Sequence, residues 1–76
     1  MIKMLTQKKV NALPIGTKIK IKWSGNTKIY KYVIKDKVGE LSCVEKFNPN
    51  AGWCYGQIDF VGKEEYHTNV WLNNSN

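Results

Sequence analysis

Two cysteines and one histidine are the residues whose types could bind a metal ion or serve a nucleophilic reaction. Ten residues separate Cys43 from Cys54, and His67 lies thirteen positions after Cys54. Zinc sites usually place two ligands only a few residues apart, and this chain lacks that spacing. A fourth ligand would have to be a carboxylate such as Asp59. We therefore predict no metal and no cofactor, and we expect both cysteines to be small buried residues with free thiols.

A Cys54–His67 nucleophile pair is the catalytic alternative. No strained nucleophile turn accompanies it, and the glycines are scattered at turns instead of forming a phosphate-cradling loop. The adjacent Glu64 and Glu65 are typical of a solvated surface. A chain of 76 residues also has little room for the rigid shell that a catalytic site needs. The sequence therefore predicts a protein that is not an enzyme.

The charge of the chain points to anionic partners. Twelve lysines, no arginine and six acidic residues give a net charge of +6. This excess favours nucleic acid, an acidic protein surface or lipid headgroups, although solvated lysines alone also explain it. Lysine lacks the planar fork with which arginine reads guanine edges. Any nucleic-acid binding is therefore predicted to be independent of base sequence.

Strict alternation over residues 17–23 predicts a strand with its lysines on one face. Residues 24–27 form a turn with Gly25-Asn26 as a two-residue loop, and residues 29–35 return as a second strand. This loop pairs Ile21 with Tyr30 and Lys20 with Lys31. One side of the hairpin is then apolar. The other side carries what we call the Lys face, a solvated or partner-binding surface made of Lys18, Lys20, Lys22 and Lys31, with Lys35 as a further candidate.

The remaining pattern predicts a short helix over residues 5–13, capped by Thr6 and ended by Pro14. Turns are expected at residues 36–39 and 48–52. Three further strands are expected at residues 40–47, 53–61 and 70–72, with Gly56 as either a bulge or a point of close approach and a frayed tail at 73–76. These elements predict a single mainly β domain over residues 1–76. Its fold is expected to be a small five-stranded antiparallel barrel or bent sheet, SH3-like or OB-type, with a short N-terminal helix.

Exposed aromatic residues are the second candidate site. A loop over residues 48–53 pairs Phe47 with Cys54 and Cys43 with Ile58, which leaves the two sulfurs about 13 Å apart and unable to bond. The apolar face then contains Leu41, Cys43, Phe47, Cys54, Ile58 and Phe60. With Cys54 facing inward, Trp53 and Tyr55 face solvent beside the loop, as interface anchors do. Trp23, Tyr32 and Trp71 are expected in the core.

The segment Leu-Pro-Ile-Gly-Thr-Lys-Ile-Lys-Ile, ahead of a tryptophan-bearing hairpin, resembles small accessory proteins of bacteriophages in low-GC bacteria. The resemblance is one of overall make-up. It transfers no functional residues, but it implies a compact inhibitor or adaptor that binds a host or phage protein. The exposed Trp53 and Tyr55 are our candidate site for that partner. The alternative is non-sequence-specific nucleic-acid binding through the Lys face. The sequence has neither a signal peptide nor a membrane span, so we expect a cytoplasmic location (the host cytoplasm for a phage protein) and no membrane partner.

Overall fold

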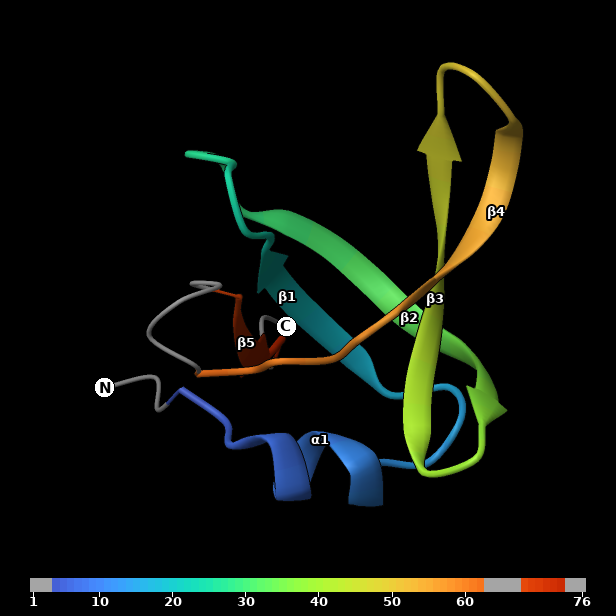
Figure 1. Ribbon diagram of the computed structural model, residues 1–76. Helices are drawn as coiled ribbons and strands as arrows, with labels where there is room; N and C mark the ends of the chain where they lie inside the picture. The colour runs from blue at the N-terminus through green and yellow to red at the C-terminus, as the bar shows by residue number, and fades with distance from the viewer. Residues whose placement is uncertain (1–3, 63–67, 74–76) are drawn as a thin grey trace.

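The computed structural model describes residues 4–62 and 68–73 of the chain (Figure 1). In these residues the elements are α1 (Gln7–Ala12), β1 (Lys18–Lys22), β2 (Tyr30–Val38), β3 (Leu41–Asn48), β4 (Gly52–Gln57) and β5 (Asn69–Leu72). The predicted mainly β class, with five antiparallel strands and one short helix, is confirmed. The strands form one sheet in the order β4-β3-β2-β1-β5, and within the described residues this sheet does not close into a barrel.

Strand β2 connects the two halves of the sheet. Residues 30–33 of β2 pair with β1, whereas Ile34 and residues 36–38 pair with β3. The register shifts between Ile34 and Asp36, where an irregularity bends the strand. Because of this bend, the β3–β4 hairpin stands at an angle to the β1–β2 pair (Figure 1). The bent sheet therefore presents two hairpins that border a common hollow.

The core lies on the inner side of the bend. Its fully buried members include Ile19 and Ile21 from β1, as well as Ile34, Val44 and Val70. Burying such a side chain stabilises the fold by roughly 1.5–3 kcal/mol.

Helix α1 closes one end of this core. The N-cap Thr6 and the end of the helix before Pro14 are as predicted, and Val10 is the buried residue of the helix. The buried Ser42 hydroxyl donates to the Val10 carbonyl oxygen at 2.9 Å, and the Lys37 ammonium donates to the Asn11 carbonyl oxygen, also at 2.9 Å. These bonds tie the C-terminal turn of the helix to the β2–β3 pair.

The predicted register of the first hairpin is confirmed, since Ile21 pairs with Tyr30 and Lys20 with Lys31. The predicted two-residue loop is wrong, because β1 ends at Lys22 and β2 begins only at Tyr30. A turn closes at the expected place, with the Asn26 N–H donating to the Trp23 carbonyl oxygen at 3.0 Å and Gly25 at a φ of 83°. The strands separate early at this turn, where Trp23 packs against the core instead of extending the ladder.

The turn expected at residues 36–39 is misplaced. Strand β2 continues to Val38, and the chain reverses at Gly39 and Glu40, where Gly39 has a φ of 59°. The register shift in β2 explains the difference, since it lets Asp36 and Lys37 stay in the ladder opposite Cys43 and Ser42. A polar pair that is typical of a turn is therefore part of a strand here.

The predicted register of the second hairpin is wrong by one residue. Phe47 pairs with Trp53, and Cys54 pairs with Lys46. The turn needs only residues 49–51, because Gly52 adopts a φ of 78° and already pairs with Asn48.

A shift of one residue exchanges the two faces of a strand. Cys43 and Cys54 therefore point to opposite sides of the hairpin. Phe47 and Phe60 are exposed, so the predicted apolar face of Leu41, Cys43, Phe47, Cys54, Ile58 and Phe60 does not exist. Strand β4 also ends at Gln57 instead of residue 61.

Part of the predicted tail is described. Asn73 lies within the described residues, and its N–H donates to the Lys18 carbonyl oxygen at 3.0 Å. Residues 74–76 of the tail expected at 73–76 lie outside the described residues, as do Glu64, Glu65 and His67.

Candidate functional site

The first hairpin carries a cluster of three aromatic side chains on its inner side. The Trp23 indole N–H donates to the Tyr32 hydroxyl oxygen at 3.0 Å, and the two rings meet edge to face at 5.8 Å between centroids. The ring centroids of Tyr30 and Tyr32 lie 6.4 Å apart. Trp23 and Tyr32 also pack against the core, as predicted. Their orientation is therefore fixed by both packing and a hydrogen bond.

The second hairpin carries three more aromatic side chains, and these are the more exposed set. Trp53 is 72% exposed, Phe47 59% and Tyr55 55%. Phe47 and Trp53 face each other across β3 and β4 with their ring centroids 5.7 Å apart. The predicted exposure of Trp53 and Tyr55 is confirmed, although the register that led to it was wrong.

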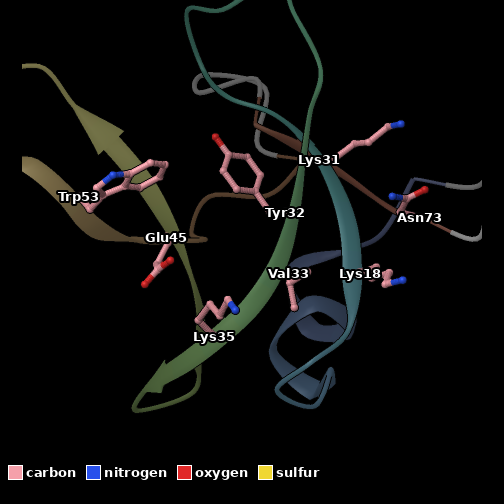
Figure 2. A pocket seen from close by; sticks show the side chains of 8 residues that line it. All are labelled: Lys18, Lys31, Tyr32, Val33, Lys35, Glu45, Trp53 and Asn73. Carbon is pink, nitrogen blue, oxygen red and sulfur yellow. The ribbon is translucent and has the colours of Figure 1, made fainter.

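Two adjoining hollows of about 270 and 370 Å³ lie between the hairpins and share Tyr32, Glu45 and Trp53 as walls. We call them together the aromatic groove. Figure 2 shows Tyr32 and Trp53 reaching toward each other from β2 and from the second hairpin. The aromatic side chains that line the groove are Trp23, Tyr30, Tyr32, Phe47 and Trp53. Three of them come from the first hairpin and two from the second, and the bend in β2 brings the two groups together.

A lysine is held inside the aromatic groove. The Lys46 ammonium nitrogen lies 4.3 Å from the centroid of the Trp23 ring, within cation–π range. Gly56 on β4 makes room for the stem of this lysine, because a Cβ atom at Gly56 would lie 2.6 Å from the Lys46 Cδ. The predicted close approach at Gly56 is therefore confirmed, and the approaching group is the Lys46 side chain.

The structure divides the predicted Lys face. Lys18, Lys31 and Lys35 line the smaller hollow of the aromatic groove, and Trp53 lines the same hollow. Lys20 and Lys22 are half-buried and do not line either hollow. We call Lys18, Lys31 and Lys35 the rim lysines.

One predicted core residue lies with the lysines instead. Trp71 on β5 pairs with Lys20 of β1, and directly opposed residues share a face of a sheet. The expectation that Trp71 belongs to the core is therefore wrong. Lys20 is flanked by Trp71 on one side and by Lys31 on the other.

Glu45, like Lys46, is a groove residue that sequence reasoning missed, and the sequence carried a signal for Glu45. In the predicted register, Glu45 would have interrupted an apolar face. In the observed register it pairs with Tyr55, is exposed and lines the aromatic groove. A charged residue on a predicted apolar face thus indicates that the face is exposed to solvent at that position, as Glu45 and Phe47 both are.

The two cysteines do not form a reactive pair. Cys43 is fully buried, and burial raises the pKa of its thiol, with the nearby Asp36 carboxylate adding to the effect. Cys54 is half-buried and its thiol donates to the Lys46 carbonyl oxygen at 3.6 Å. Both thiols are free. Among residues 4–62 and 68–73, no three histidine, cysteine or acidic side chains gather as a metal site would require.

Comparison of the chain with models of protein families, with curated proteins and with solved structures finds no match. In the described part of the chain, no helix has the length and apolar character that a membrane crossing requires.

Proposed function

We propose that this protein is a non-enzymatic binding module that holds an acidic segment of a partner protein in the aromatic groove. The observation that carries the proposal is Trp53, a 72% exposed tryptophan whose ring borders a hollow rimmed by three lysines. Tryptophan and tyrosine supply much of the binding energy of protein interfaces. The rim lysines add charge complementarity, which speeds association and selects acidic partners. A compact inhibitor or adaptor acting on a host or phage protein fits this arrangement.

We also propose that the fold belongs to the SH3-like alternative. Strands β1 to β4 pair consecutively, and β5 returns beside β1. The OB-type alternative is a Greek-key barrel, which this consecutive order does not support. The aromatic groove then lies between the two hairpins of an open SH3-like sheet.

Affinity capture from a native lysate tests the proposed function. The wild-type protein is expected to retain a protein partner whether or not the lysate is treated with nuclease. Trp53→Ala is expected to lose that partner while the protein stays folded, with only a small decrease in stability from the lost contact with Phe47. Ile15→Ala is the matched control, since Ile15 is 59% exposed but does not line the groove. Capture by Trp53→Ala at the wild-type level would contradict the proposed site.

Single-stranded nucleic acid is the second candidate ligand, because exposed aromatic rings beside lysines can stack bases and bind phosphates. We place it second because the resemblance to small phage accessory proteins implies a protein partner, whereas the Glu45 carboxylate in the groove opposes phosphates and carboxylates alike. If the three rim lysines contact phosphates, the logarithm of the affinity should fall against the logarithm of salt concentration with a slope of about −2. An oligonucleotide that shows no mobility shift at low salt would remove this candidate.

A further inference from the structure

The two edges of the sheet differ in whether another segment pairs with them. The outer edge of β5 is covered by the N-terminal segment, because Met4 bridges to Trp71 and the Leu5 N–H donates to the Val70 carbonyl oxygen at 2.7 Å. Strand β4 is the opposite edge, and within the described residues its only strand neighbour is β3. An uncovered edge presents free N–H and C=O groups to another strand.

The register identifies which backbone groups of β4 point outward. The Ile58 N–H donates to the Ser42 carbonyl oxygen at 2.9 Å, so this pair is a hydrogen-bonded one. Bonded and non-bonded pairs alternate along an antiparallel ladder. The N–H and C=O groups directed away from β3 therefore belong to the non-bonded positions of β4, namely Trp53, Tyr55 and Gln57.

Strand β4 carries none of the charges, prolines or bulges that commonly protect an edge strand. The sequence Gly-Trp-Cys-Tyr-Gly-Gln contains neither a charged residue nor a proline, and its register with β3 is continuous, without a bulge. Natural sheets discourage edge pairing with such charges, prolines or bulges. Trp53 and Tyr55, both more than half exposed, flank the open ladder. No charge, proline or bulge on β4 therefore opposes its pairing with another strand.

We propose that the strand it accepts is β4 of a second copy of this chain, in an antiparallel pairing centred on Tyr55. The outward positions are symmetric about Tyr55, as a two-fold interface requires. In this pairing Tyr55 meets Tyr55 of the second copy, and Trp53 meets Gln57 of the second copy. The two strands exchange about six backbone hydrogen bonds, two for each bonded pair.

Charge does not oppose this pairing locally. No charged side chain lies on β4, and the charged neighbour of Tyr55 is Glu45, one strand away. The two Glu45 residues of a dimer are separated by three strand spacings, about 14 Å. This exceeds the screening length of about 8 Å at physiological ionic strength. The neutrality and symmetry of β4 therefore favour a second copy over a charged foreign strand.

The mass in solution tests the dimer. Sedimentation equilibrium over a range of concentrations is expected to give a species of about twice 8.8 kDa. Gln57→Pro removes one outward N–H from each copy and leaves Trp53 and Tyr55 unchanged, so the dimer dissociation constant should rise about tenfold or more. Gln57→Ala, which keeps the N–H, is the matched control and should stay dimeric. A wild-type protein that is monomeric at every concentration would overturn the proposal, as would a Gln57→Pro variant that dimerises normally.

Cross-linking tests the register independently of the proline variant. In a Cys54→Ser background, Tyr55→Cys places two thiols directly opposite each other at about 5.5 Å between Cα atoms, within disulfide range. In Trp53→Cys the two introduced cysteines lie four residues apart along the ladder, a separation of about 13 Å, so this variant should not cross-link. Equal cross-linking of both variants would reject this register. A different result would assign the edge to a foreign strand. If the wild-type protein is monomeric and Gln57→Pro no longer captures the partner, the edge binds that partner and the dimer proposal is rejected.

Discussion

At the scale of single residues, Lys46 shows how the aromatic groove is held open. Its ammonium lies over the Trp23 ring, and its stem fills the space that Gly56 leaves. Trp23 is in turn fixed to Tyr32 by a hydrogen bond. A lysine, a glycine and two aromatic residues from three strands and a loop thus set the relative position of the two hairpins.

Removing the charge of Lys46 should therefore cost stability. Lys46→Met keeps an apolar stem beside Gly56 and loses the attraction to the Trp23 ring, so the free energy of unfolding should fall by about 0.5–1 kcal/mol. Urea denaturation measures the change. Lys28→Met, at an exposed loop position, is the control and should be close to neutral. If the two variants are equally stable, the cation–π contact contributes nothing.

The pH dependence of stability offers a second prediction, at Cys43. Burial and the Asp36 carboxylate raise the pKa of this thiol, while the Lys37 ammonium and a hydrogen bond from the Val38 backbone partly oppose the shift. The folded protein therefore holds the proton more tightly than the unfolded chain. The resulting stability is complete below the thiol pKa of the unfolded chain and is lost as the pH rises through the higher folded value.

Chemical denaturation at neutral and at alkaline pH measures this loss. Cys43→Ala is less stable overall because it leaves a small cavity, but it lacks this titration. The alkaline decrease in unfolding free energy should therefore be smaller in Cys43→Ala than in the wild type. An identical decrease in both proteins would exclude the thiol as its source.

At the scale of elements, the two hairpins show what the sequence can and cannot predict. The register of β1 with β2 follows from the alternation of isoleucine and lysine, because a slip would bury charge. The β3–β4 hairpin lacks such a pattern, since Cys43 and Val44 are adjacent and both fully buried. Its register depends on the positive φ of Gly52, a conformation that the sequence permits but does not require. The bend of β2 is a tertiary feature, so the meeting of Trp53 with the rim lysines was not predictable.

The attachment of α1 also depends on one side chain. The Gln7 amide nitrogen donates to the Ile58 carbonyl oxygen at 3.0 Å and to the Asn11 side-chain oxygen at 2.8 Å. The Gln7 side-chain oxygen accepts from the Val61 N–H at 2.9 Å. One glutamine thus fastens the chain that follows β4 to the helix.

Gln7→Ala should loosen this segment more than the rest of the fold. Losing these part-buried hydrogen bonds should lower the free energy of unfolding by about 1–3 kcal/mol. Hydrogen exchange should speed up most at the Val61 amide, which loses its acceptor. Lys8→Ala, an exposed neighbour on the same helix, should leave that amide unaffected. Unchanged exchange at Val61 in Gln7→Ala would show that the segment is held by packing alone.

At the scale of the whole molecule, the net charge of +6 and the position of the rim lysines have separable effects. A charge that acts through the overall field should influence a partner from anywhere on the surface. A charge that acts through contact should matter only at the aromatic groove. Electrostatic complementarity chiefly changes the association rate and its dependence on salt. The two kinds of effect can therefore be separated by removing the same number of lysines from two places.

Replacing Lys18, Lys31 and Lys35 by glutamine takes the net charge from +6 to +3, since three positive charges are removed. Replacing Lys8, Lys9 and Lys28, which are exposed and lie outside the groove, gives the same net charge. With the captured acidic partner, surface plasmon resonance should show about tenfold slower association for the rim variant and a weaker salt dependence. The distant variant should show a smaller loss in association rate. Equal losses in both variants would mean that the partner responds to the overall field, and that the groove owes its specificity to Trp53 and its aromatic neighbours alone.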